Sequence, residues 1–302
     1  MEARPLLKWA GGKRQLLPAL RRFYPAAFGT YFEPFAGSAA VFFDLHAHGR
    51  LEGHVAVLAD SNIDLIACYT AVRDEPEKVI EALDRLAAGH ARRGSRHYYD
   101  VRDRQFNPER SHRCGAAYTP ELAAMFIYLN RTGYNGLFRL NADGAFNVPA
   151  GRYTNPRICD AGNLRHVSAA LQAPGVRIVV QPFDHVGREA KPGDFLYFDP
   201  PYAPLSRTAS FTGYTAERFS GEDQETLRNL IVDLASRGCH VILSNSTAPD
   251  VTRLYEGHQA VAAAGLRCHR VPARRAINSN AKRRGNVEEY LITNVPQTLE
   301  IG

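Results

Sequence analysis

The chain has no apolar run long enough to cross a membrane. None of its hydrophobic stretches reaches the roughly 18 residues that a membrane-spanning helix requires. Its first residues, Met1–Pro5, hold no apolar signal core. We therefore expect no membrane partner and residence in the cytoplasm.

Cysteine is scarce and widely scattered. The five cysteines are odd in number and form no Cys-x-x-Cys pair; they are Cys68, Cys114, Cys159, Cys239 and Cys268. A disulfide framework or a zinc site needs paired or closely spaced cysteines. We therefore expect reduced thiols and no metal site.

The chain does have the length for a large core, and it has an excess of positive charge. It holds 302 residues, of which 45% are apolar and 23% charged, as is ordinary for a globular protein. A formal net charge of +6 favours a polyanionic partner. Neither an internal repeat nor a low-complexity linker divides the sequence, so a second domain must be inserted within the first.

The most informative stretch is the segment Phe195–Tyr202. Its apolar half has no helical period and indicates a buried strand, and two prolines then end the strand directly after Asp199. The turn presents a carboxylate, proline carbonyls without a local partner and the ring of Tyr202, at the strand end where open α/β sheets hold ligands. This set suits a planar group with an exocyclic NH₂. The alternative is an ordinary strand end that Asp199 caps.

Two glycine-containing turns lie near the N-terminus. Gly11–Lys13 lacks the first glycine and the Ser/Thr of a phosphate-binding loop, so it indicates either a ligand-contacting turn or an ordinary turn before a helix over 15–23. The aromatic strand around Tyr31–Glu33 leads into the small-residue turn Pro34–Ser38 and a helix over 38–48. Such a turn lets the backbone approach a ligand at the positive end of the helix.

A second carboxylate ends the strand predicted over 55–60. In dinucleotide-type α/β folds, an acid at the place of Asp60 bonds the hydroxyls of a ribose. The alternative is that Asp60 caps the following helix. The preceding glycine turn favours the ribose.

The segment 129–153 is expected to carry a β-hairpin. Its turn, Asn141–Gly144, contains an Asp-Gly pair, and arginines alternate with aromatics along both sides. A β-ribbon fits the major groove of DNA, where arginine bonds guanine and an aromatic side chain can enter the base stack. The alternative is an exposed hairpin without a partner.

Two further stretches suit a nucleic-acid backbone. A hydroxyl-rich loop includes Ser206, and the segment 265–286 holds seven Lys/Arg, among them Arg275, and no acid. A solvated face is the alternative for this basic run.

The segment 74–118 is predicted to be helical, with a solvated loop over Ala91–Arg96.

Taken in order, these motifs resemble the Dam-type DNA adenine-N6 methyltransferases, which act on adenine in GATC. The resemblance covers roughly residues 5–294 and rests on Leu7–Lys13, Glu33–Ser38, Leu58–Asn62, Gly133–Arg139, Phe146–Tyr153, Asp199–Ser206, Phe211–Tyr214 and Arg274–Asn280. It implies an α/β fold with a Rossmann-like sheet over 1–70 and 160–302. It also implies an inserted, mainly helical DNA-recognition domain over 71–159 that carries the hairpin.

The resemblance implies S-adenosylmethionine as the methyl donor and double-stranded DNA as the partner of a monomer located at the nucleoid. Cofactor contacts are expected from Trp9, Lys13, Glu33, Pro34, Gly37, Asp60, Phe183 and Asp199. The flipped adenine is expected to meet Asp199, Pro200 and Tyr202. DNA contacts are expected from Lys8, Tyr134, Asn135, Leu137, Arg139, Pro149, Arg152, Ser206, Arg275 and Asn278.

The chain departs from the family pattern at a few places. Ser38 and Ala39 replace a second glycine of the cofactor turn, Pro182 stands where many relatives carry Asp, and Asp143 lies at the hairpin tip. Two rival functions stay open: methylation of an amide or amine in RNA or protein, and DNA binding without catalysis. The hairpin and the basic run weigh against a protein substrate, and the intact Asp199–Tyr202 motif weighs against a silent binder.

Overall fold

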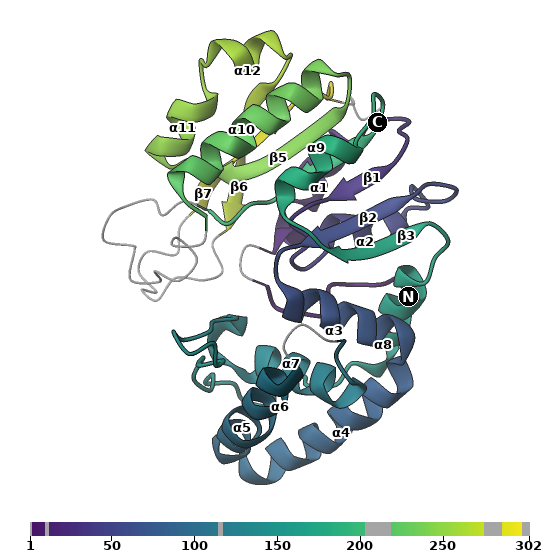
Figure 1. Cartoon of the computed structure of the whole chain (residues 1–302), viewed down its shortest axis with the longest axis vertical. Helices are drawn as coiled ribbons and strands as arrows, with labels where there is room; N and C mark the ends of the chain where they lie inside the picture. The colour runs from purple at the N-terminus through teal and green to yellow at the C-terminus, as the bar shows by residue number, and fades with distance from the viewer. Residues whose placement is uncertain (1, 10–11, 114–116, 203–218, 275–285, 298–302) are drawn as a thin grey trace. The chain divides into compact units, whose positions relative to one another are not determined.

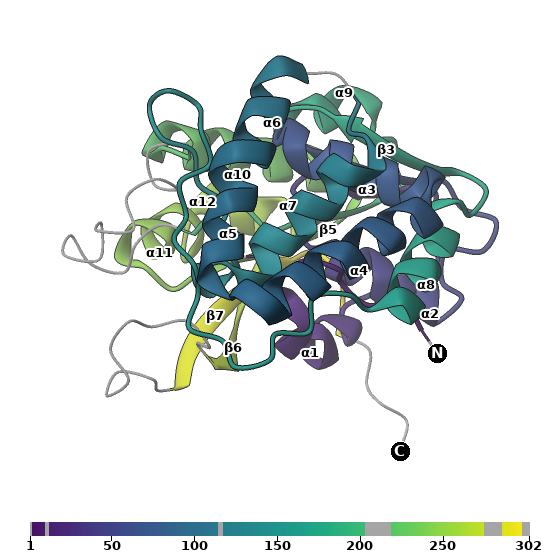
Figure 2. The same cartoon turned by 90° about the horizontal axis from the view of Figure 1, so that it is seen from below.

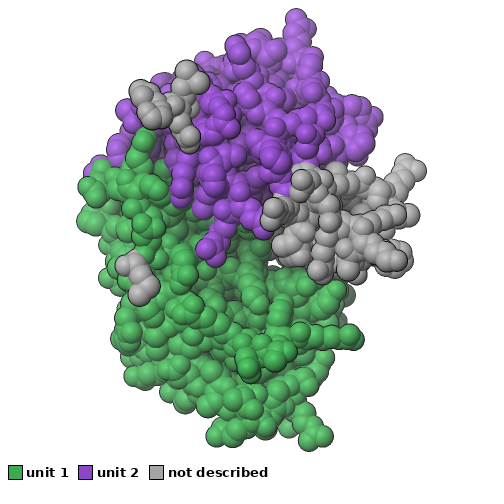
Figure 3. All heavy atoms as spheres, turned by 180° about the vertical axis from the view of Figure 1, so that it is seen from behind, with its two compact units in different colours: residues 1–12, 37–52, 62–180 green, residues 13–36, 53–61, 181–302 purple. Residues whose placement is uncertain are grey.

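The computed structural model describes residues 2–9, 12–113, 117–202, 219–274 and 286–297. Contacts divide the chain into two compact units, shown in separate colours in Figure 3. Unit 1 comprises residues 1–12, 37–52 and 62–180, and unit 2 comprises residues 13–36, 53–61 and 181–302. The domain boundaries expected at 70/71 and 159/160 stay a prediction.

The described residues contain a seven-stranded, mixed sheet in the order β3-β2-β1-β4-β5-β7-β6. Its strands are β1 (Tyr31–Glu33), β2 (Ala56–Asp60), β3 (Val176–Val180), β4 (Phe195–Phe198), β5 (His240–Ser246), β6 (Arg267–Arg274) and β7 (Asn286–Thr293). Strands that alternate with helices along the chain produce this α/β class. The expected fold class, with its Rossmann-like sheet, is confirmed.

Four neighbouring strands of unit 2 run parallel. β1 pairs with β2 and with β4, and β4 pairs with β5, so that Phe198 lies opposite Leu243. Every residue of β4 is buried, as its unbroken apolar sequence requires of a strand covered on both faces. Because parallel strands end at the same edge, Glu33, Asp60 and Asp199 are brought to one edge of the sheet.

The last two strands of unit 2 run antiparallel to this set. β7 pairs with β5 and with β6, and Figure 2 shows β6 and β7 side by side. In this register Ser246 lies opposite Glu289, at the end of β5. The beginning of β7 therefore reaches the edge where the parallel strands end.

Short helices complete unit 2. They are η1 (Lys13–Gln15), α1 (Leu17–Arg21), η4 (Phe183–His185), α9 (Val186–Glu189), α10 (Gly221–Ser236), α11 (Pro249–Tyr255) and α12 (Gln259–Ala263). α10 begins with a capping box, in which Ser220 and Asp223 bond each other's backbone N–H. It packs along β5 (Figure 1).

Unit 1 is mainly helical. Its helices are α2 (Ala40–Ala47), α3 (Ile63–Asp74), α4 (Pro76–Arg93), α5 (Ser95–Val101), the π-helix η2 (Arg102–Phe106), α6 (Asn107–Arg113), α7 (Pro120–Thr132), η3 (Tyr134–Gly136) and α8 (Ala161–Leu171). The loop expected over Ala91–Arg96 is wrong. α4 runs to Arg93 and α5 starts at Ser95, with only Gly94 between them at a φ of +52°, a conformation that glycine adopts without strain.

The predicted hairpin is present, but it is not a regular two-stranded ribbon. Two isolated bridges join its sides, Leu140 with Phe146 and Gly133 with Ala150. The turn is closed by Asn141, whose carbonyl accepts from the Gly144 N–H at 2.9 Å and whose side chain accepts from the Ala145 N–H at 2.8 Å. The remaining side chains of this segment are therefore presented from an irregular loop.

No helix in the described part of the chain is long and apolar enough to cross a membrane. Across those same residues, no cluster of three or more His, Cys, Asp or Glu side chains could hold a metal ion.

Candidate active site

The site of unit 2 is centred on an ion pair at the carboxyl edge of the sheet. Asp199 follows β4 directly, and its Oδ1 lies 2.9 Å from the Nζ of Lys13 in η1. The Lys13 side chain is only 4% exposed, so this pair is screened by little water. The glycine pair of the sequence is therefore followed directly by Lys13, which supplies the cation of this ion pair.

A chain of hydroxyl groups supports Asp199 from β5. Ser244 Oγ donates to Asp199 Oδ1 at 3.2 Å, and the Tyr197 hydroxyl lies 2.9 Å from Ser244 Oγ. Burial raises the pKa of Asp199, while Lys13 and the Ser244 hydrogen bond act in the opposite direction. Lys13 and Ser244 therefore favour the carboxylate form that can accept hydrogen bonds.

Tyr202 is held by two contacts, one to its ring and one to its hydroxyl. Lys13 Nζ lies over the ring, 4.2 Å from the centroid, and the hydroxyl donates to Glu289 Oε2 of β7 at 2.7 Å. Burial raises the pKa of Tyr202 well above its usual value, and the charges of Asp199 and Glu289 raise it further. Tyr202 is therefore a neutral phenol that donates to Glu289.

The second of the two prolines between these residues, Pro201, has a side-chain partner. Gln224 of α10 donates to the Pro201 carbonyl at 3.5 Å and accepts from Asn245 Nδ2 at 3.1 Å. This partner of the Pro201 carbonyl lies 23 positions away in the chain, and 3.5 Å is a long hydrogen bond. The turn is thus fixed by the proline rings, by α10 and by β5.

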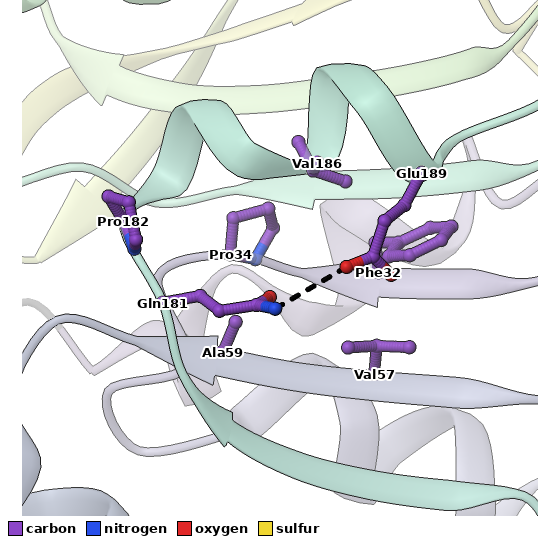
Figure 4. Close-up of a pocket in the computed structure, with 8 residues that line it drawn as sticks. All are labelled: Phe32, Pro34, Val57, Ala59, Gln181, Pro182, Val186 and Glu189. Atoms are coloured by element: carbon purple, nitrogen blue, oxygen red, sulfur yellow. Dashed lines mark hydrogen bonds between the residues drawn. The ribbon is translucent and has the colours of Figure 1, made fainter.

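The neighbouring strand end holds Glu33, which is buried. The Tyr31 hydroxyl donates to Glu33 Oε2 at 2.8 Å. Pro34 follows and lines a shallow pocket together with Pro182, as Figure 4 shows. Across this pocket Gln181 donates to Glu189 at 3.4 Å.

Asp60 ends β2, and the cap of the following helix is a different residue. Asn62 caps α3, with its side-chain oxygen accepting from the N–H groups of Asp64 and Leu65 at 3.1 and 3.3 Å. The alternative that Asp60 caps this helix is therefore wrong. The Asp60 carbonyl accepts from the Gln181 N–H at 3.2 Å, which joins β2 to the segment before η4.

Phe183 in η4 belongs to an aromatic cluster. Its ring stacks on Phe35 at 5.2 Å between centroids, and Phe219 packs against both rings. Phe35 directly follows Glu33-Pro34, so the cluster is next to the strand end of β1.

Unit 1 contains the other two predicted cofactor residues. Trp9 stacks on Phe138 at 6.2 Å and tilts against Phe126 at 6.5 Å. The Gly37 carbonyl accepts from the buried Tyr69 hydroxyl at 3.0 Å. Gly37 and Ala39 have φ of +46° and +52°, so Ala39 holds a left-handed conformation at the position where the family pattern has glycine.

Lys8 is tied to the start of the hairpin segment by Asn130 of α7. Asn130 accepts from the Lys8 N–H at 2.8 Å and donates to the carbonyls of Lys8 and Gly136 at 2.9 and 2.8 Å. The Lys8 ammonium bonds the Arg131 carbonyl at 3.2 Å and lies 4.0 Å from the ring centroid of Tyr153. Burial and the Arg131 charge lower the pKa of Lys8.

The hairpin segment presents most of the predicted DNA contacts at the surface of unit 1. Tyr134, Arg139, Pro149 and Arg152 are exposed, and Asn135 and Leu137 are half-buried. Asn135 adopts a φ of +54°, which asparagine tolerates better than most residues. Arg139 Nε donates to Asn147 Oδ1 across the hairpin at 2.7 Å.

Three predicted DNA residues, Ser206, Arg275 and Asn278, lie outside the described residues. The described part of the basic run forms β6. There Arg270 pairs with Glu256 at 2.8 Å and with Glu288 at 3.6 Å, so acids from elsewhere in the chain offset some of its positive charge.

Sequence reasoning missed Ser244, Gln224 and Glu289. The polar end of the apolar strand, Ser244–Ser246, was the available signal for β5, and the acid pair Glu288–Glu289 was the signal for β7. Neither pattern shows by itself which strands become neighbours.

Comparisons with known proteins agree with these motifs. Residues 9–276 match the family described as D12 class N6 adenine-specific DNA methyltransferase. The chain is 40% identical over 292 residues to the type II methyltransferase M1.LlaDCHI of Lactococcus lactis subsp. cremoris, covering 96% of this chain and 95% of the relative.

Two other relatives are similar over comparable lengths. The type II methyltransferase M.MjaIII of Methanocaldococcus jannaschii is 38% identical over 305 residues, which are 97% of this chain and 100% of the relative. The DNA adenine methylase of Escherichia coli K12 is 34% identical over 288 residues, which are 95% of this chain and 94% of the relative. The chain belongs to the D12 class of N6 adenine-specific DNA methyltransferases.

Proposed function

We propose that this methyltransferase transfers a methyl group from S-adenosylmethionine to N6 of adenine within GATC, after the adenine has been flipped out of double-stranded DNA. The observation that carries the proposal is the turn Asp199–Tyr202 at the carboxyl edge of the sheet, with Lys13 2.9 Å from Asp199. This turn holds an acceptor, a proline carbonyl and a ring within one short segment.

The residues of unit 2 fit S-adenosylmethionine by their chemistry. The stacked pair Phe35–Phe183 offers an aromatic surface for an adenine. Asp60 at the end of β2 suits the two ribose hydroxyls, and its role as a helix cap is excluded by Asn62. S-adenosylmethionine, when bound, supplies an electrophilic methyl group on a sulfonium.

The chain's own residues prepare the nucleophile. The lone pair of adenine N6 is delocalised into the ring, which makes it a weak nucleophile. Asp199 and the Pro200 carbonyl accept the two N6 hydrogens, so that N6 becomes more tetrahedral and its lone pair points out of the ring plane. As N6 forms its bond to the methyl carbon, the bond from that carbon to sulfur breaks and the sulfonium leaves as a neutral thioether. N6 then carries a positive charge and releases one proton to the Asp199 carboxylate and then to water. Alignment supplies most of the acceleration.

Base flipping follows from the position of the reacting atom. N6 of a paired adenine lies inside the duplex, and extruding the base costs a few kcal/mol. Stacking on Tyr202 returns about 1–3 kcal/mol, by analogy with proteins that bind single strands. In unit 1, Tyr134 is 42% exposed and supplies an aromatic side chain that can enter the gap in the stack.

The hairpin segment supports recognition of GATC. Its motifs Gly133–Arg139 and Phe146–Tyr153 carry the resemblance to the Dam-type enzymes, and Arg139 is exposed at its surface. Arginine bonds guanine O6 and N7 in the major groove. Lys8, Asn135, Leu137, Pro149 and Arg152 complete the proposed contact set, together with Ser206, Arg275 and Asn278.

The test is plasmid DNA from cells that make the protein or its Asp199→Ala variant. Digestion with endonucleases that are blocked by, or require, adenine methylation at GATC reports the site. Mass spectrometry of the nucleosides reports N6-methyladenine at any site. The wild type is expected to protect GATC, and the variant is not.

N6-methyladenine without protection of GATC would replace the proposed site by another sequence. A wild-type protein that yields no N6-methyladenine in DNA would overturn the proposal. Methyl incorporation into RNA or protein in the same cells would then favour one of the rival substrates.

A further inference from the structure

We propose that Glu289 on β7 is a positioning residue for methyl transfer, because it fixes the ring of Tyr202 and shares the ammonium of Lys13. This inference rests on the proposed function of the turn Asp199–Tyr202. It concerns a residue that follows the catalytic turn by 87 positions in the chain.

The first observation is the hydrogen bond at the tip of Tyr202. Its hydroxyl donates to Glu289 Oε2 at 2.7 Å, a length typical of a strong hydrogen bond to a carboxylate. At its other end, Tyr202 follows two prolines whose φ angles are fixed. A ring anchored at both ends keeps one orientation, which a flipped base needs in order to stack without further ordering.

The second observation is the position of Lys13 between two carboxylates. Its Nζ lies 2.9 Å from Asp199 Oδ1 and 3.9 Å from Glu289 Oε2, while it also lies 4.2 Å from the ring centroid of Tyr202. Opposite charges at these distances attract Lys13 toward both acids. Glu289 therefore draws the ammonium toward the Tyr202 ring and limits how far it can move onto Asp199.

The third observation is the register of β7. Glu289 lies opposite Ser246 of β5 and Val271 of β6, and alternate residues of a strand point to opposite faces. The Glu289 side chain is accordingly 17% exposed, whereas the neighbouring Glu288 side chain is 57% exposed and lies 3.6 Å from Arg270. Glu288 is therefore a matched control with the same charge and the opposite orientation.

The site thus consists of four side chains from distant parts of the chain. Lys13 contacts both the ring of Tyr202 and the carboxylate of Asp199. In the proposed mechanism the base stacks on that ring, and the carboxylate accepts from the amino group. Glu289 contacts the hydroxyl of Tyr202 and lies 3.9 Å from the ammonium of Lys13. It acts through Tyr202 and Lys13, so its loss changes how well the base is held and not whether DNA binds.

The experiment compares steady-state methylation of a GATC duplex by six forms: wild type, Glu288→Ala, Glu289→Ala, Glu289→Gln, Tyr202→Phe and the double variant Tyr202→Phe/Glu289→Ala. Glu289→Ala is expected to lower kcat about 10- to 100-fold, the effect of one lost hydrogen bond to a charged group. The KM for the methyl donor and the affinity for DNA should stay within about twofold of the wild type. Glu288→Ala should match the wild type.

The Gln and Phe variants separate positioning from general loss of structure. Glu289→Gln keeps an oxygen that accepts from Tyr202 but loses the charge that attracts Lys13, so it should recover part of the rate. Tyr202→Phe keeps the ring but loses the hydroxyl, so the double variant Tyr202→Phe/Glu289→Ala should be no slower than the slower single variant.

Two results would overturn the inference. One is a Glu289→Ala enzyme with the rate of Glu288→Ala. The other is a set of variants in which Glu289→Gln is as slow as Glu289→Ala, or in which the Tyr202 and Glu289 effects multiply. A wild type that methylates no adenine in any duplex would instead reject the proposed function, so the two failures are distinguishable.

Discussion

In the proposed mechanism Asp199 needs its negative charge to accept a hydrogen from the amino group, and Lys13, 2.9 Å away, stabilises that charge. Burial raises the pKa of Asp199, and Lys13 opposes the rise. We therefore expect activity to be lost as the pH falls through the raised pKa of Asp199. A residue that lowers this pKa keeps Asp199 ionised, and the enzyme active, at a lower pH.

Replacing Lys13 by methionine should move the acidic limb of the kcat–pH profile to higher pH. The reason is that burial then raises the pKa of Asp199 without the Lys13 charge, which is the largest contribution that lowers it. Lys13→Arg keeps the positive charge and should leave the limb closer to its original position. Lys191→Met, at an exposed site, is the control, and an unchanged acidic limb in Lys13→Met would show that Asp199 is not the group that titrates.

Asp60 and Asn62 offer a pair of neighbouring substitutions with different expected effects. Asp60→Ala should raise the KM for S-adenosylmethionine with little change in kcat, because a ribose contact is equally strong in the ground and transition states. Asn62→Ala should lower the free energy of unfolding by about 1 kcal/mol, since it removes the cap of α3. Thermal unfolding and initial rates measure both, and a normal cofactor KM in Asp60→Ala would remove Asp60 from the cofactor site.

At the scale of elements, unit 1 uses a buried ion pair to join a helix to the hairpin turn. Arg110 of α6 bonds both oxygens of Asp64 in α3 at 2.7 and 2.9 Å, and it also donates to the Gly144 carbonyl at 2.6 Å. The Tyr118 hydroxyl donates to the same carboxylate. One arginine thus connects the α3 helix with the tip of the hairpin.

Asp64→Asn should destabilise the protein by about 3 kcal/mol, because the Arg110 charge is left without its buried partner. The pair of Arg113 with Glu109, at 2.6 Å, provides the comparison, because its two side chains are 34% and 41% exposed. Arg113→Met should change stability by less than about 1 kcal/mol. Denaturant unfolding measures both variants, and equal losses would mean that burial does not distinguish the two pairs.

For the molecule as a whole, the net charge of +6 raises the affinity for DNA of any sequence. Discrimination between DNA sequences must therefore come from particular side chains. Arg139→Ala tests whether the hairpin reads bases or only holds the backbone. A forked contact to guanine is worth about 1–3 kcal/mol of discrimination, whereas a phosphate contact weakens all sequences alike and lowers the salt slope by about one unit. We expect the variant to lose its preference for GATC with little change in salt dependence.

The measurement is the initial rate on GATC duplexes and on duplexes that differ from GATC at one base, at two ionic strengths. A preference that survives together with a smaller salt slope would make Arg139 a backbone contact. Arg104, which is 82% exposed on the π-helix, is the control for the loss of one surface charge.

The sequence predicted the strand ends that carry acids, because Phe195–Phe198 and Ala56–Asp60 combine an apolar run with an abrupt polar stop. It could not predict Ser244 or Glu289 as parts of the site, because a partner on another strand depends on strand order and register and not on local pattern. The hairpin turn was predictable from Asn141–Gly144. Its irregular sides were not, because they depend on bonds from distant residues such as Arg110 and Asn107.

The helix boundary at Gly94 shows the same limit at a smaller scale. The basic cluster Ala91–Arg96 suggested a loop, since charge is common in solvated connections. A helix tolerates exposed arginines equally well, and only the backbone conformation of Gly94, at a φ of +52°, separates α4 from α5.

The antiparallel placement of β7 has a consequence for protein synthesis. During synthesis Lys13 leaves the ribosome before Asp199 and Tyr202, and Glu289 comes after all of them. A nascent chain that has released the catalytic turn but not β7 therefore has Tyr202 without its hydrogen-bond acceptor and Lys13 paired with Asp199 alone. The complete arrangement of charges arises only after β7 has emerged and inserted between β5 and β6, so we expect full methylating activity only after that step.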